Sequence, residues 1–225
     1  MGSVTCDAVA DDEDLELVAR VGSSDPLDTM VKAGAQVAVE FTTAATVLEN
    51  TRWLLDRGVH VVVGASGLTD DDLSALARHT GDANCLVVAN FAIGAVLMMR
   101  VAEQVAAHLP QAEIIEAHHA GKADAPSGTA LRTAARIAAA RTAAVTVPGP
   151  PEQPARGLLH SDVPIHSVRL PGVVASQEIV FGGPGQTLTI RHDSIDRRSF
   201  MPGVLLAVKA IADRPGLTVG LDPVL

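Results

Sequence analysis

The chain has 225 residues, a formal net charge of −9 and a hydrophobic content of 48%. This length allows one large domain or two small ones, with enough apolar residues for a sizeable core. The acidic balance argues against nucleic acid or an anionic membrane as the main partner, because both need a basic surface. Two cysteines are too few for a disulfide framework or a zinc cluster. No apolar run approaches the ~20 residues of a membrane span and no signal peptide is recognisable, so we expect a cytoplasmic protein.

The first part of the chain alternates short apolar runs with helical patterns. This alternation is typical of βαβ units and predicts a Rossmann-like parallel sheet. A helix start is indicated at Thr69, which precedes three consecutive aspartates. The expected strands are residues 15–21, 37–41, 59–63 and 85–88, and the expected helices are residues 48–55 and 69–79.

The pattern changes after Asn90, where several strands follow one another with few helical signals between them. We expect helices at residues 93–108 and 128–144, strands at 112–117, 165–170, 177–181 and 187–192, and an irregular loop at 147–154. This order predicts a second, α+β domain with a mixed open sheet. A helix at 204–211 and a strand at 217–219 return to the first domain. The predicted α/β fold therefore has two domains, one made of residues 1–90 and 201–225 and the other of residues 91–200.

The loop HHAGKADAPSGT, residues 118–129, carries the groups most suited to chemistry. His118 and His119 follow a strand directly, and Lys122 lies four residues past the first of them. Histidine holds or passes a proton near neutral pH, and a nearby lysine supplies a cation and a proton. A bare pair of histidines is equally well explained by a solvated loop. A metal site is the weaker interpretation, because no third ligand stands at the right spacing.

The end of this loop has the features of an anion-binding site. Ser127 and Thr129 place hydroxyls and backbone N–H groups at the start of a helix, and Gly128 allows close approach of a ligand. An ordinary capped helix start explains the threonine but not the cationic residues before it. We therefore expect a donor-rich pocket that selects a small anion such as a carboxylate.

Three other predicted strands end in short polar or glycine-containing turns. Phe41 and Thr42 follow one strand, Gly64 and Ser66 lie in a GASG turn after the next, and Asn90 and Phe91 follow a third. In doubly wound sheets, such turns at the carboxyl ends of strands hold nucleotides. A glycine turn alone is weak support, since it connects most βα units, but three such ends together favour a ligand crevice.

The run from Glu116 to Ala130 matches the pattern E-x-H-H-x-x-K-x-D-x-P-S-G-T-A. This run strongly resembles the hallmark of the 4-hydroxy-tetrahydrodipicolinate reductases (dihydrodipicolinate reductases) of lysine and diaminopimelate synthesis. The resemblance extends over nearly the whole chain through VEFT, GASG and VANFAIGAVL. The segments IHSVRLPG and QTLTIRHDS are similar to the actinobacterial branch of the family.

The resemblance implies hydride transfer from NADPH or NADH to a cyclic imine dicarboxylate, with a proton delivered to the adjacent carbon. Residues 1–90 and 201–225 would form a dinucleotide-binding-type domain, and residues 91–200 a substrate-binding and oligomerisation domain. His118 would be the catalytic acid/base and Lys122 a proton donor, and the enzyme would be a homotetramer. The implied substrate-binding residues are His119, Lys122, Ser127, Gly128 and Thr129. The implied cofactor-binding residues are Gly2, Phe41, Thr42, Gly64, Ser66, Asn90, Phe91, Arg197 and Phe200.

The sequence departs from the family at its beginning. The family opens with a strand and a glycine loop, G-x-x-G-[RK]-M-G, whose last part aligns with Met1-Gly2-Ser3 here. About ten to twelve residues are absent, which is one strand of typical length and most of the phosphate cradle. Either the true start lies upstream, or this is a short form with lost dinucleotide binding. Gly22 stands where the family has an acid for the ribose, which permits NADPH.

Two other functions are compatible with the sequence. A chain without the redox cofactor would use the His118/Lys122 pocket for proton transfer, dehydration or cyclisation of a related anion. Alternatively, the chain would be a non-catalytic binding or regulatory subunit that retains the fold.

Overall fold

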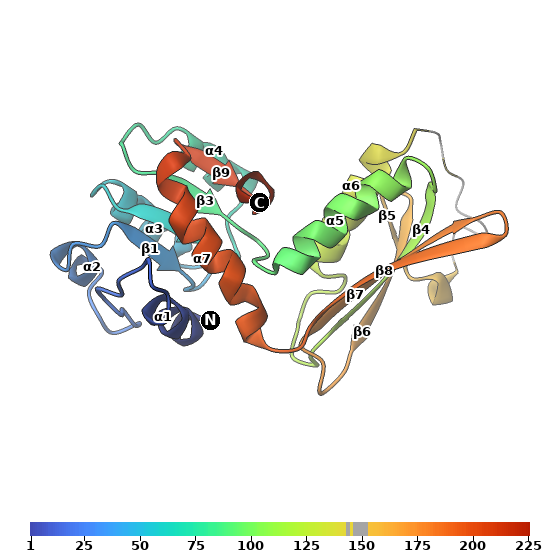
Figure 1. Ribbon diagram of the computed structural model, residues 1–225, viewed down its shortest axis with the longest axis horizontal. Coiled ribbons are helices and arrows are strands. Elements are labelled where there is room, and N and C mark those ends of the chain that lie inside the picture. Colours follow the sequence, from blue (N-terminus) through green and yellow to red (C-terminus); the bar gives the residue numbers. More distant parts are fainter. Residues whose placement is uncertain (143–144, 146–152) are drawn as a thin grey trace. The chain divides into compact units, whose positions relative to one another are not determined.

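The computed structural model describes residues 1–142, 145 and 153–225 and divides the chain into two units (Figure 1). The first unit contains Met1–Ile93 and Phe200–Leu225, and the second contains Gly94–Ser199. The end of the predicted helix at residues 143–144 and most of the predicted loop at 147–154 lie outside the described residues. The first unit carries a parallel sheet and the second a mixed sheet, so the predicted fold class is confirmed.

The first unit is built on four parallel strands in the order β1-β2-β3-β9. Their bounds are β1 (Val37–Glu40), β2 (His60–Val63), β3 (Cys85–Val87) and β9 (Leu217–Val219). Val61, Val62 and Val63 are fully buried, which explains the uninterrupted apolar run, because a central parallel strand is covered on both faces. The helices of this unit are α1 (Gly2–Ala10), α2 (Asp28–Lys32), α3 (Val47–Leu55), α4 (Asp70–Ala77) and α7 (Met201–Ala210).

The predicted start of α4 is confirmed in detail. The Thr69 side chain accepts a hydrogen bond from the Asp72 amide at 3.2 Å, and the Asp72 carboxylate accepts one from the Thr69 amide at 2.8 Å. This reciprocal capping satisfies two N–H groups that have no partner within the helix.

Short 3₁₀ turns lie at Pro154–Arg156, Arg197–Phe200, Ile211–Asp213 and Asp222–Val224.

The predicted strand at residues 15–21 is wrong. The side chains there alternate between half-buried and exposed, as in a strand, but none of the described strands pairs with this segment. A cavity of about 1060 Å³ lies beside it, lined by Leu15, Leu17, Val21, Val37 and Val39 among others. The outer edge of β1 is therefore separated from residues 15–21 by open space. Without a neighbouring backbone, the segment has no ladder of hydrogen bonds to join.

The second unit contains a five-stranded sheet in the order β5-β6-β4-β7-β8. β4 is parallel to β6, and the other pairs are antiparallel, as expected for a mixed sheet. The bounds are β4 (Gln111–His118), β5 (Leu158–His160), β6 (Val163–Arg169), β7 (Ala175–Gly183) and β8 (Gln186–Ser194). The expected strands 165–170, 177–181 and 187–192 correspond to β6, β7 and β8, and the short β5 was not foreseen.

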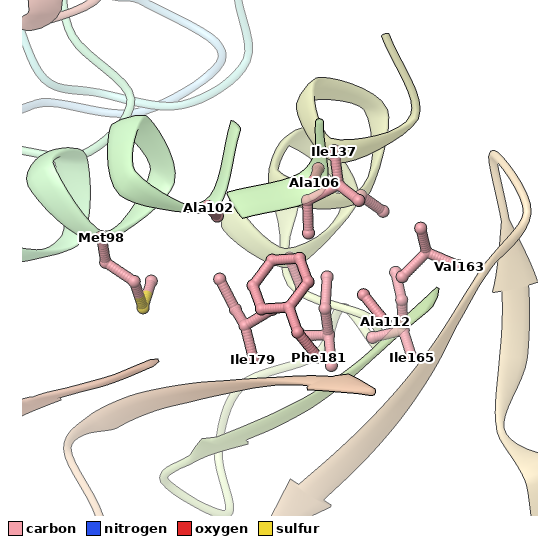
Figure 2. Close-up of a cluster of buried hydrophobic side chains, with 12 residues drawn as sticks. Met98, Ala102, Ala106, Ala112, Ile137, Val163, Ile165, Ile179 and Phe181 are labelled. Carbon is pink, nitrogen blue, oxygen red and sulfur yellow. The ribbon is translucent and has the colours of Figure 1, made fainter. Parts of the chain in front are cut away.

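Two helices, α5 (Ile93–Ala106) and α6 (Gly128–Ala140), cover one face of this sheet. The α5 residues that belong to this core, Met98, Ala102 and Ala106, are spaced four apart and so lie along one side of the helix. Figure 2 shows side chains from these helices and from the sheet meeting around Phe181. This core fixes the end of β4 and the start of α6, which frame the loop that carries His118. In the part of the chain that the structure describes, none of the helices combines the length and apolar character of a membrane span.

Candidate active site

The loop with the predicted catalytic residues joins the last residue of β4 to the first turn of α6. Side chains alternate along β4, so that Ala112, Ile114, Glu116 and His118 share the face that the helices cover. Ala112 and Ile114 belong to the apolar core, whereas Glu116 and His118 continue the same face beyond it. The sheet thus places a carboxylate and an imidazole at the edge of an apolar core.

His118 is held by hydrogen bonding to Glu116. Its Nδ1 lies 2.5 Å from Oε2 of Glu116, and the side chain of His118 is 17% exposed. Burial lowers the pKa of His118 below 6.5, and the Glu116 carboxylate opposes that shift without reversing it. The ring is therefore mainly neutral at pH 7, and Nε2 is the nitrogen left for a substrate. A neutral, oriented imidazole that can gain and lose a proton suits general acid–base work.

A buried ion pair stands directly behind this histidine. Glu116 is fully buried, and Arg169 of β6 donates to both of its carboxylate oxygens, Nη2 to Oε1 at 2.8 Å and Nη1 to Oε2 at 3.0 Å. Burial alone would raise the pKa of Glu116, but hydrogen bonds from Arg169, Ser167 and His118 bring it below its ordinary value. Glu116 is thus an anion inside the unit, in a bidentate pair.

Lys122 has its own counter-ion within the loop. Its Nζ lies 2.6 Å from Oδ1 of Asp124, and that contact lowers the pKa of Asp124. The backbone oxygen of Asp124 also accepts a hydrogen bond from Arg169 at 2.6 Å. The cationic residues of this loop and of β6 are therefore balanced by two carboxylates, Asp124 and Glu116. An incoming anion would have to compete with Asp124 for Lys122.

The first turn of α6 has the geometry of an anion site. The Ser127 hydroxyl accepts from the Ala130 amide at 3.2 Å and so caps the helix, while the Ser127 amide donates to Oε1 of Glu116. A Cβ built on Gly128 would meet no described atom within 4 Å, so the space beside its backbone is open. Amides of a first turn have no acceptor within the helix, and they carry the positive end of its dipole. Gly128 is exposed and Thr129 is half-buried, and His119 at the other end of the loop is exposed.

The predicted cofactor residues of the first unit gather at the carboxyl ends of β1, β2 and β3. The rings of Phe41 and Phe91 pack edge to face, with their centroids 5.7 Å apart. A Cβ on Gly64 would lie 2.1 Å from the Phe41 ring, so only glycine fits between these two turns. Thr42 donates its amide and its hydroxyl to the buried Glu40, which fixes the turn after β1. Nucleotides bind at turns of this kind in parallel sheets, so these residues could hold part of NAD(P)H.

The other expected cofactor residues occupy several elements. Ser66 is exposed in the turn after β2, and the Asn90 side chain accepts from the Ala92 amide at 2.9 Å. Gly2 begins α1 and lines the cavity beside residues 15–21. Arg197 belongs to the second unit and Phe200 to the first. Among the residues described here, no cluster of three or more His, Cys, Asp or Glu side chains is arranged to hold a metal ion.

These features define a class of protein: a two-unit α/β enzyme with a nucleotide-type parallel sheet, an oriented histidine and a helix N-terminus suited to an anion. The chain matches the family described as "Dihydrodipicolinate reductase, N-terminus" over residues 1–91 and "Dihydrodipicolinate reductase, C-terminus" over residues 94–225. It therefore belongs to the dihydrodipicolinate reductase family, which uses NAD(P)H, and it is a reductase enzyme.

Similar proteins cover the whole chain. It is 49% identical to the 4-hydroxy-tetrahydrodipicolinate reductase of Nocardia farcinica and 49% identical to that of Cutibacterium acnes, each over 100% of this chain and 94% of the relative. A solved structure, "Dipicolinate bound Dihydrodipicolinate reductase from Paenisporosarcina sp. TG-14", is 38% identical with a TM-score of 0.82, and the match covers 100% of this chain and 95% of that one. The family resemblance stated from the sequence is confirmed.

Proposed function

We propose that the chain reduces a cyclic imine dicarboxylate, the precursor that its relatives convert to tetrahydrodipicolinate, in lysine and diaminopimelate biosynthesis. The observation that carries this proposal is the meeting of an oriented, neutral histidine with a helix N-terminus on one short loop. The relatives named 4-hydroxy-tetrahydrodipicolinate reductase and the solved relative with bound dipicolinate support the same substrate class.

The second unit supplies the substrate site. The first turn of α6, with Ser127, Gly128 and Thr129, would bind one carboxylate through backbone N–H groups and the Thr129 hydroxyl. Lys122 and His119 would bind the other charged end, with Lys122 leaving Asp124 as the substrate arrives. A dianion suits this arrangement because two separate donor groups are available, one on each side of the loop.

The second unit also carries the groups that would transfer the proton. NAD(P)H, when bound, supplies the hydride. His118, with Nδ1 directed at Glu116, would exchange a proton through Nε2, and Lys122 would donate one close by. Placing both groups on one rigid loop between a strand and a helix keeps them within reach of the same substrate atom.

The first unit is proposed to hold the dinucleotide at the carboxyl ends of its strands. Phe41, Thr42, Gly64 and Phe91 support this role because they form one ordered group there. Gly22 in place of the family's acid permits NADPH, but the Asp25 carboxylate accepts a hydrogen bond from the Gly22 amide at 2.8 Å and so places a negative charge at this turn.

The open face of the second sheet is proposed to mediate self-association. Ile115 on β4 and Val168 on the neighbouring β6 are each 41% exposed, and the register places them on the face away from the helices. Exposed apolar residues grouped on one sheet face are typical of an interface between copies. Light scattering would test the expected tetramer, and a monomeric chain would contradict it.

Calorimetric titration with pyridine-2,6-dicarboxylate and pyridine-2-carboxylate tests the proposed function. The dicarboxylate should bind about tenfold more tightly or better, because one charge-assisted contact contributes about 1.5–3 kcal/mol. Lys122→Gln should remove most of that preference. Lys32→Gln is a charge-matched control, because Lys32 pairs with Asp28 on α2 and should not alter affinity. Equal affinity for the two ligands would remove the main support for an acidic substrate.

A further inference from the structure

Glu116 contacts three separate segments of the second unit at once. Its Oε2 receives His118 Nδ1 and Arg169 Nη1, and its Oε1 receives Arg169 Nη2 and the Ser127 amide at 3.2 Å. An ionised carboxylate has about four acceptor sites, and with the further hydrogen bond from Ser167 these contacts occupy all of them. The carboxylate therefore links the imidazole, the neighbouring strand and the start of α6.

The contact with Glu116 determines which ring nitrogen of His118 carries the proton. A carboxylate that is ionised can only accept, so His118 must donate from Nδ1. In the neutral ring, Nε2 is then the unprotonated nitrogen and faces away from Glu116. A proton gained by the ring enters at Nε2 and leaves from there, while Nδ1 stays bonded to Glu116.

Arg169 is what allows Glu116 to remain an anion in this place. A fully buried carboxyl without a cation would take up a proton and then compete as a donor. The bidentate pair from β6 prevents that, and the same guanidinium also bonds the Asp124 backbone oxygen. Arg169 thus holds both the carboxylate and the loop beyond Lys122.

We propose that Glu116 and Arg169 are positioning residues for the reductase: Glu116 holds the His118 proton on Nδ1 and, through the Ser127 amide, ties that ring to the helix turn that binds the substrate carboxylate. This inference rests on the proposed function for His118 as the proton-transfer group. The expectations from the sequence assigned no role to either residue.

The charge of Glu116 also tunes the acid form of His118. Among the described residues, the charged groups that act on this ring are Glu116 on β4, Lys122 on the loop and Arg169 on β6, while Asp124 faces Lys122. Lys122 and Arg169 disfavour the imidazolium, and Glu116 alone of these favours it. Removing that charge should lower the pKa of His118 by about 1–3 units, as for any opposite charge at this range.

The test is a pH titration of the imidazole ¹⁵N signals in the full chain without ligand. His118 is assigned by its loss in His118→Gln. We expect the Nδ1-protonated form in the parent chain, and in Glu116→Gln a titration at least one pH unit lower. Glu113→Gln is the matched control, since Glu113 also lies on β4 and pairs with Arg156 and His166. It should leave the His118 titration unchanged.

The titration tests the positioning role of Glu116, and the pH profile of kcat tests the part of His118 in the reaction, so the two can fail separately. An Nε2-protonated ring, or an unchanged titration in Glu116→Gln, would overturn the positioning role whatever the activity. If Glu116→Gln does not fold, Glu116→Asp should give a smaller shift of the same sign, and no shift would again overturn it. When the titration moves as expected, the pH profile of kcat should move with it. If the pH profile of kcat does not change although the His118 titration does, His118 is not the proton-transfer group, and the positioning role of Glu116 still holds.

Discussion

Replacing Arg169 with methionine should destabilise the second unit by an amount that depends on pH. Methionine keeps the apolar stem but removes the guanidinium that bonds both oxygens of Glu116. Breaking one side of a buried ion pair costs about 3–5 kcal/mol, because the other charge remains buried. Arg169 is 18% exposed, so water can partly replace it and we expect about 3 kcal/mol at pH 7.5.

The sign of the pH dependence follows from Glu116. In the parent chain the pKa of Glu116 lies below its ordinary value of 4.5, so the ion pair stabilises the fold above that pH. That stabilisation is lost as pH falls through the lowered pKa. Without Arg169, burial raises the pKa of Glu116, so the variant loses stability as pH rises. The gap between the two proteins should therefore be small near pH 4.5 and widen toward pH 7.5.

Hydrogen exchange of peptides from β4 and β6, corrected for intrinsic rates, measures this gap at both pH values. Arg191→Met is the control, because Arg191 lies on β8 and pairs with exposed Asp193. A surface pair of this kind contributes about 0–1 kcal/mol, so its removal should change exchange little at either pH. Equal destabilisation by Arg169→Met at pH 4.5 and 7.5 would refute the reasoning, since the buried charge would then not be its cause.

A further prediction concerns ligand binding. Asp124→Asn should let pyridine-2,6-dicarboxylate bind up to about fivefold more tightly, because Lys122 is freed from a partly exposed pair that contributes about 1 kcal/mol or less. Calorimetry measures this change, and weaker binding would show that Asp124 shapes the site.

The strands of the first unit's sheet were predictable because each is a short apolar run in the sequence. The run VHVVV can only be a strand covered on both faces, and the Thr69 signature placed a helix start correctly. Residues 15–21 show the limit of this reasoning. LELVARV alternates as a strand should, but a strand needs a neighbour, and pairing is a property of other parts of the chain. Helix α1 was missed because GSVTCDAVA has few strong helix formers.

The site was predictable in its exposed chemistry but not in its buried support. His118, Lys122 and Ser127 stand together in the sequence, so their proximity followed from a single loop. Arg169 lies 53 residues from Glu116, and only the parallel pairing of β4 with β6 brings them together. One signal was available: Glu116 falls on the inward register of β4, where a charge needs a buried partner.

The central claim is that the loop after β4 performs the proton chemistry of an NAD(P)H-dependent reductase. The most direct measurement is the rate of NADPH oxidation with 4-hydroxy-tetrahydrodipicolinate as substrate, for the parent chain, His118→Ala and Lys122→Ala. Each variant should lower turnover by about 10²–10⁴-fold, the usual contribution of a general acid or base, while hydrogen exchange in the second unit stays close to that of the parent chain. Full turnover in both variants would contradict the account.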